Sequence, residues 1–206
     1  MARQQRALRT RDALIRSAAE VVDRDGFTAT SLTEICTLAG VSYGALHFHF
    51  DNKVALAEAV EAAALERLGA LLGEASPGAG SRLQRLVDVT HALARGLTSD
   101  VVLRAGFVLC GDAAWAPVAD PRAYWQQWVE DLVREAGEVG ELRSVAESEG
   151  IVTTVVGATV GFEVLGARDA AWLAPRTITQ FWELLLPTLA SPELLVRLDA
   201  KGARGV

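Results

Sequence analysis

The stretch that decides the fold is AGVSYGALHFHFDNK, from Ala39 to Lys53. It places Gly40 between two short segments, and the second of them is rich in aromatic and histidine side chains. Glycine readily adopts the left-handed conformation that ends one helix before another begins. The stretch therefore predicts two short helices joined by a tight turn.

The residues before this stretch predict the helices that support it. Residues 5–25 have apolar positions at steps of three and four, which is typical of an amphipathic helix, and Gly26 is expected to stop it. Ser31 and Glu34 are spaced as a capping box, which predicts the start of the next helix. A longer helix is expected from Lys53 to about Leu72, with Asp51 or Asn52 as its cap. The apolar positions of the first helix are Leu8, Leu14, Ile15, Ala18, Val21 and Val22.

Two short helices with a supporting helix match the helix-turn-helix plan, in which the second helix enters the DNA major groove. Cys36 is expected where a small residue lets the two helices approach, and both Cys36 and Cys110 are interpreted as packing residues. The apolar contacts between the helices are assigned to Ile35, Leu38, Val41, Leu46 and Phe50.

The remaining residues of the second helix are expected to face DNA. Tyr43 and His47 lie one turn apart, where a hydroxyl and an imidazole can reach phosphates. Gly44 and Ala45 are small enough for the backbone to lie close to base edges. Lys53 offers a charge to a phosphate at the start of the next helix. The predicted DNA contacts are Arg6, Arg9, Ser31, Thr33, Ser42, Tyr43, Gly44, Ala45, His47, Phe48, His49 and Lys53.

Composition indicates an all-α protein with two functions. The chain has 206 residues, of which 50% are hydrophobic and only six are proline. Its net charge is -6. Residues 1–53 hold seven basic and six acidic side chains, a net charge of +1, which leaves -7 for the rest. This asymmetry predicts a DNA-binding domain over residues 1–52 and a second domain over residues 53–206.

The second part of the chain predicts further helices near 82–97, 100–110, 121–137, 144–165 and 175–190. Residues 73–81 are interpreted as a linker, and the tail from Ser191 to Val206 is either a last helical turn or frayed. GIVTTVVGATVGFEVLG, from Gly150 to Gly166, is apolar on nearly all sides and is interpreted as too short to cross a bilayer, so protein must bury it. Together with a second apolar helix it predicts a four-helix homodimer interface. The apolar residues of that second helix are Phe181, Trp182, Leu184, Leu185 and Leu186. Two ordinary core helices of a monomer are the alternative.

The stretch TSLTEICTLAGVSYGALHFHFDNKVALAEAV resembles the DNA-binding domain of the TetR family of bacterial transcriptional repressors. The start MARQQRALRTR, VVLRAGF at Val101–Phe107 and DPRAYWQQWVEDLVREAGEVGEL at Asp120–Leu142 are similar to the gamma-butyrolactone receptors of that family. The resemblance implies a repressor that binds a palindromic double-stranded operator as a dimer. A small hydrophobic effector, of the butyrolactone type, would release it.

The resemblance also implies an effector site. Trp125 matches the tryptophan that butyrolactone receptors place in the ligand pocket, although core packing is an equal alternative. The acidic charge around the expected pocket disfavours an anionic effector. The predicted effector contacts are Trp125, Trp128, Val102, Leu103, Phe107, Val155 and Thr159, of which the last five are equally explained as core residues.

The chain departs from the family at several positions. Tyr43 stands where lysine is usual, His47 where tyrosine is usual, and Arg122 and Ala123 where an aromatic residue is common. These differences leave open a pseudo-receptor that senses an antibiotic or a biosynthetic intermediate.

An enzyme is the remaining alternative, and the motifs do not favour it. His47 and His49 are two residues apart and point to different sides of a helix, so they are not a metal pair. His91 is isolated, and no nucleophile motif is present. We expect no cofactor, no metal and no membrane span, and a protein that acts in the cytoplasm, at the nucleoid when it is bound to DNA.

Overall fold

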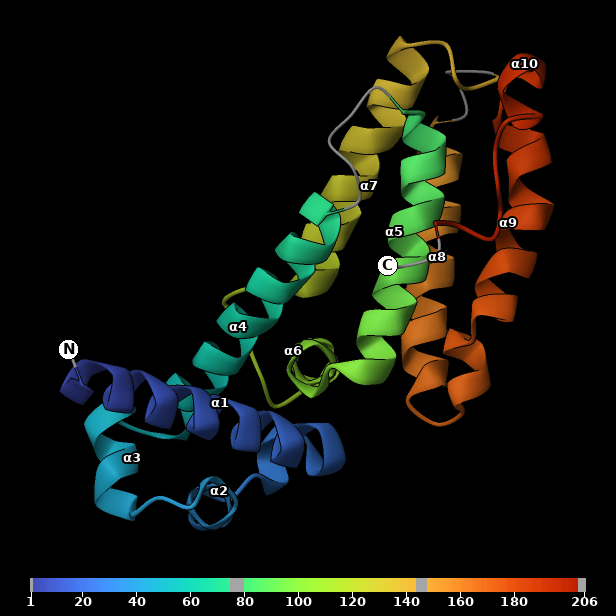
Figure 1. Cartoon of the computed structure of the whole chain (residues 1–206). Helices are drawn as coiled ribbons and strands as arrows, with labels where there is room; N and C mark the ends of the chain where they lie inside the picture. The colour runs from blue at the N-terminus through green and yellow to red at the C-terminus, as the bar shows by residue number, and fades with distance from the viewer. Residues whose placement is uncertain (1, 75–79, 144–147, 204–206) are drawn as a thin grey trace. The chain divides into compact units, whose positions relative to one another are not determined.

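The computed structural model describes residues 2–74, 80–143 and 148–203 (Figure 1). In these ranges the regular structure is helical, apart from an isolated antiparallel bridge between Leu142 and Ala190. The chain divides into two compact units: residues 1–68 with 100–121, and residues 69–99 with 122–206. The predicted all-α class is confirmed.

This division differs from the predicted domain boundary after residue 52. The reason is packing: Leu56 and Val60 of α4 (Lys53–Glu74) and Val102 and Leu109 of α6 (Val101–Gly111) share one buried core with the first three helices. The boundary at residue 52 concerns function and stays a prediction.

The first unit begins with α1 (Ala2–Ala29), whose buried stripe starts at Leu14. Leu8, the first of the apolar positions that predicted this helix, is 55% exposed. Gly26 adopts φ 77° and ψ 173° and breaks the helix, which then resumes for a further turn. A glycine with positive φ therefore ends the first helix at the predicted place, and a short further helical turn follows it.

Helices α2 (Leu32–Ala39) and α3 (Tyr43–His49) form the predicted helix-turn-helix. Gly40 adopts the left-handed conformation with φ 66° and ψ 31°, as expected, and its N–H donates back to carbonyls of α2. Ile35 and Leu46 are fully buried, whereas Leu38 is 49% exposed and was wrongly placed between the helices.

Ser31 and Glu34, which were predicted to form a capping box at the start of α2, do not do so in the part of the chain that the structure describes. Ser31 stands at the N-cap by its backbone, but its side chain caps no N–H there. Glu34 instead accepts a hydrogen bond from Arg24 of α1 at 2.6 Å. A contact between two helices has replaced the local one.

In the second unit α5 (Arg82–Ser99) packs against α8 (Ser148–Gly166), the 3₁₀ helix η2 (Ala170–Leu173) and α9 (Pro175–Leu189). The unit also contains nearly all of α7 (Pro121–Glu138), and α10 (Pro192–Leu195). η2 was not predicted, and α10 is the helical turn left open for the tail. Parts of the predicted linker, 75–79, and of the predicted helix start, 144–147, lie outside the described residues.

The tail beyond α10 is held against α5. The side chain of Gln84 and the backbone of Asp199 exchange hydrogen bonds of 3.0 and 2.8 Å. His91 Nε2 lies 3.0 Å from the carbonyl oxygen of Ala200. His91 is buried, so it is part of the packing between α5 and the tail.

Candidate DNA interface and effector site

The surface of α3 carries most of the predicted DNA contacts. Ser42 is the N-cap, and its hydroxyl accepts from the Ala45 N–H at 3.2 Å, so this side chain starts the helix. The rings of Tyr43 and His47 meet edge to face with centroids 4.6 Å apart, on one side of the helix. Phe48 is 77% exposed. An exposed polar and aromatic face on the second helix is the arrangement that reads a major groove.

The other predicted DNA contacts of this unit differ in how far they are exposed to solvent. Arg6, Arg9, Ser31 and Thr33 are exposed, so their side chains are accessible to a phosphate backbone. Of α3's own residues, Ala45 and His49 are partly buried and Gly44 is exposed.

Lys53 faces the protein. Its ammonium donates to the carbonyl oxygens of Phe27, Thr28 and Thr30 at 2.9, 3.2 and 3.3 Å, and lies 4.5 Å from the centroid of the Phe27 ring. A lysine has three N–H donors, and all three are used here. The ammonium therefore ties the start of α4 to the end of α1, a role that differs from the predicted phosphate contact.

Two further contacts of the first unit fix the end of α1. Arg104 of α6 forms an ion pair with Asp23 at 2.9 Å. The Asp112 carboxylate accepts from the backbone N–H of Phe27 at 2.9 Å, directly after the Gly26 break. No local sequence pattern indicates these contacts, because the partners are more than 80 residues apart.

Glu61 of α4 is a fully buried carboxylate. It accepts from the Trp115 indole N–H at 2.6 Å and from the backbone N–H of Val118 at 3.2 Å. The Trp115 ring also packs against Phe27, with centroids 4.6 Å apart. Glu61 thus holds the segment after α6 on α4, and its signal in the sequence was an acid on the apolar face of a helix.

The predicted effector residues of the second unit come together around Trp125. This side chain is 1% exposed, and its indole N–H donates to the Thr159 hydroxyl at 2.8 Å. That hydroxyl donates onward to the Val155 carbonyl oxygen at 2.9 Å. Trp128 stacks on Trp125 with ring centroids 5.4 Å apart and an interplanar angle of 21°. The indole N–H of Trp125 is thus occupied by the Thr159 hydroxyl.

Val102, Leu103 and Phe107 are buried in the first compact unit. Trp125, Trp128, Val155 and Thr159 belong to the second. Only the second group forms the cluster described above.

An ion pair lies one helical turn from the Trp125–Thr159 bond. Arg122 donates to both carboxylate oxygens of Glu163, from Nε at 3.0 Å and from the terminal nitrogen at 3.2 Å. Burial raises the pKa of Glu163, and the nearby guanidinium of Arg122 opposes that rise. The α7–α8 contact is therefore polar one helical turn from Trp125.

No group of metal-ligating side chains that could hold an ion is found among the described residues. α8 is long and apolar enough to cross a membrane by length and composition, contrary to the interpretation that it is too short. The core helix of a soluble protein passes the same test.

Comparison with known proteins agrees with this architecture. The family model described as bacterial regulatory proteins, tetR family, matches residues 14–60, which contain both helices of the helix-turn-helix. The A-factor receptor protein of Streptomyces griseus is 29% identical, over 98% of this chain and 71% of that protein.

Two solved structures are similar over almost the whole chain. A gamma-butyrolactone receptor, described as an ArpA-like protein, has a TM-score of 0.82 and 27% identity, and the match covers 95% of this chain and 96% of that one. TylP, a TetR regulator from Streptomyces fradiae, has a TM-score of 0.70 and 30% identity, with coverage of 96% and 87%.

A helix-turn-helix joined to a larger helical body defines a DNA-binding transcription regulator rather than an enzyme. The chain belongs to the TetR family of bacterial regulatory proteins and resembles its gamma-butyrolactone receptors.

Proposed function

We propose that this protein is a repressor that binds a palindromic operator as a homodimer and is released by a small hydrophobic effector of the butyrolactone type. The observation that carries the proposal is the exposed face of α3 in a chain whose relatives include an A-factor receptor. Its place of action is the cytoplasm, at the nucleoid when it is bound to DNA.

The DNA contacts of the proposal are those of the exposed α3 face and the accessible residues of α1 and α2. Tyr43 and His47 are assigned to phosphates, and Gly44, Ala45 and Phe48 to base edges. The α4 N-terminus offers the positive end of its helix dipole to a phosphate, although the Ala55 N–H is bound to the Asn52 side chain and the Lys53 ammonium is occupied. Arg6, Arg9, Ser31, Thr33, Ser42 and His49 complete the interface.

The homodimer is supported by α8. Only Ile151, Val155 and Thr159 of this apolar helix are buried within the chain. A side chain added at Gly157 or Gly161 would meet nothing within 4 Å, so another helix can approach closely there. On α9, Leu184 is 79% exposed. A large exposed apolar surface of this kind is typical of a protein–protein interface.

Substitution at Leu184 tests the dimer. Leu184→Glu places a charge in the proposed interface, whereas Val196→Glu changes a residue that is 84% exposed outside it. We expect light scattering after gel filtration to give a dimer for the native chain and for Val196→Glu, and a monomer for Leu184→Glu. A monomeric native chain would refute the proposed assembly.

The effector is assigned to the cluster around Trp125, where the stacked tryptophans offer a flat apolar wall. An effector acts only if it binds the DNA-free arrangement more tightly than the DNA-bound one. The proposed lever is α4, whose residues belong to both compact units. The coupling would be on the order of 1–3 kcal/mol per site.

The test is a gel shift on DNA from upstream of the protein's own gene, with synthetic butyrolactones and then host culture extract added. Release by a lactone supports the proposal, and Trp125→Ala should then respond less while it still binds DNA. Operator affinity that no lactone or extract changes would refute it.

The Arg122–Glu163 ion pair favours a second candidate, a pseudo-receptor of the same fold that senses an antibiotic or an intermediate. A charged pair beside Trp125 suits a more polar effector than an alkyl lactone. Release by extract together with no response to any lactone would favour this candidate.

A further inference from the structure

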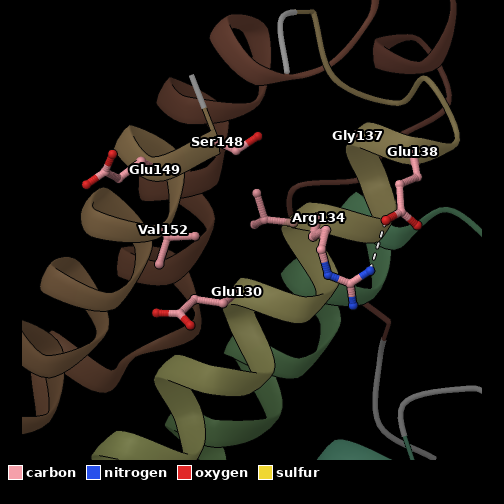
Figure 2. A pocket seen from close by; sticks show the side chains of 8 residues that line it. Glu130, Arg134, Gly137, Glu138, Ser148, Glu149 and Val152 are labelled. Carbon is pink, nitrogen blue, oxygen red and sulfur yellow. Dashed lines mark hydrogen bonds and ion pairs between the residues drawn. The ribbon is translucent and has the colours of Figure 1, made fainter. Parts of the chain in front are cut away.

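A groove of about 680 Å³ lies between the second half of α7 and the first turns of α8 (Figure 2). This volume suits a small molecule. No step of the proposed repressor mechanism uses the groove. Its lining residues are Glu130, Val133, Arg134, Gly137, Glu138, Ser148, Glu149 and Val152.

The only basic side chain in this lining is already neutralised. Arg134 donates to Glu138 at 2.9 Å, as Figure 2 shows, and to Asp131 at 3.3 Å. Two carboxylates therefore compensate one guanidinium. An anionic ligand would find no uncompensated cation among the groove residues that the structure describes.

Glu130 is the carboxylate best placed to meet a ligand. In Figure 2 its side chain extends from α7 toward α8, below Val152. Gln126 donates to it at 2.8 Å, but an amide carries no charge. Within the described ranges no basic group lies at ion-pair distance from Glu130. Glu149 adds a second negative charge on the α8 side and points away from α7.

The rest of the surface between these charges is apolar. Val133 is buried, Val152 is half-buried, and Gly137 adds no side chain. We propose that this groove binds a small hydrophobic amine, whose ammonium pairs with Glu130 and whose apolar body lies against Val133 and Val152. Charge complementarity selects the amine over a neutral or acidic molecule of the same shape.

The groove is separate from the effector cluster. Val133 follows Trp125 by eight residues, and Val152 precedes Thr159 by seven, which places the two sites about 10–12 Å apart along the helices. Both involve α7 and α8, so an amine would provide a second chemical input to the same pair of helices.

Three eight-carbon probes test the proposal on the full chain: octylamine, 1-octanol and octanoate, each below its micelle concentration and each titrated by calorimetry without DNA. We expect octylamine to bind about fivefold more tightly than 1-octanol, since a half-exposed ion pair adds a modest increment, and octanoate to bind most weakly. Equal affinity for all three probes, or no binding of the amine, would overturn the proposal.

Variants locate the binding site. Glu130→Gln should remove the preference for the amine over the alcohol, whereas Glu183→Gln, on an exposed acid of α9, should keep it. Val152→Trp should fill the groove and abolish binding of all probes, with thermal unfolding as the check on folding. Trp125→Phe should leave amine binding unchanged, which separates this result from the repressor proposal.

Other outcomes contradict the inference directly. An amine preference that survives Glu130→Gln would refute the assigned partner, even if Val152→Trp fails to fold. Amine affinity that falls as subunit concentration rises would show that a second copy, and not a ligand, covers the groove.

Discussion

The buried carboxylate of Glu61 allows a stability prediction to be worked from the structure. It accepts two hydrogen bonds, from the Trp115 indole at 2.6 Å and from the Val118 backbone at 3.2 Å. Glu61→Gln keeps one acceptor oxygen and replaces the other by an amide NH₂ group. The amide must then direct a donor at one of the two N–H groups.

The expected cost follows from these contacts. A hydrogen bond to a charged acceptor contributes about 1.5–3 kcal/mol, and a buried donor left without an acceptor costs about 1–3 kcal/mol. Val118 is the longer contact and is the one expected to be lost. We therefore predict that Glu61→Gln lowers the free energy of unfolding by about 2–4 kcal/mol. Glu58→Gln, at an exposed position of the same helix, should change it by less than about 0.5 kcal/mol.

The assay is urea unfolding followed by circular dichroism, which does not depend on tryptophan fluorescence. Trp115→Phe removes the donor of the shorter hydrogen bond to Glu61. The two substitutions therefore act on the same contact, and the double variant Glu61→Gln/Trp115→Phe should lose less free energy of unfolding than the sum of the two single variants, by at least about 1 kcal/mol. A loss below about 0.5 kcal/mol for Glu61→Gln, or strictly additive losses, would refute the reasoning.

Three further predictions use other contacts. Tyr43→Lys adds a charge on the exposed α3 face, so the slope of log affinity against log salt should steepen by about 0.9 in operator titrations; an unchanged slope would mean that residue 43 lies away from phosphate. Trp182 and Trp125 are both buried, but only the Trp182 indole N–H lacks a partner among the described residues. Trp125→Phe should therefore destabilise the chain by about 1–2 kcal/mol more than Trp182→Phe in urea unfolding, and equal losses would contradict this. Burial raises the pKa of Glu163 above its ordinary value of 4.5, so the folded state retains a proton that the unfolded state has released. The free energy of unfolding of the native chain, measured relative to that of Glu163→Gln, should thus fall as pH rises from about 4.5 through the folded-state pKa of Glu163. A difference between the two chains that does not change with pH would exclude this linkage.

Local chemistry explains which parts of the fold were predictable. Gly40 ends α2 in the left-handed conformation because glycine adopts it without steric cost, and this preference is visible in the sequence. The periodic apolar residues of α1 from Leu14 onward likewise lie in the core. Such features depend on neighbours within a few residues.

Contacts between distant residues explain the errors. Glu34 has the correct spacing for a capping box, yet Arg24 of another helix takes its carboxylate. Lys53 is a predicted phosphate contact, yet three backbone carbonyl oxygens near the end of α1 accept hydrogen bonds from its ammonium. Periodicity alone also could not show that Leu38 faces outward.

Residues of the candidate site were predictable from the sequence, but the hydrogen bonds and ion pairs that join them were not. The resemblance singled out Trp125, and Thr159 was named as a weak pocket residue, but the hydrogen bond that joins them is a tertiary contact. Glu61 and the Arg122–Glu163 pair were not assigned roles, because their partners lie 41 or more residues away.

The exposed apolar surface of α8 has a consequence for the life of the protein in the cell. If the proposed homodimer forms, a newly made subunit would present this surface until it meets a second one, and its folded lifetime would then depend on how many copies are present. Chaperones and proteases would act on unpaired subunits at low abundance. Such a regulator would disappear faster than simple dilution predicts once its synthesis stops.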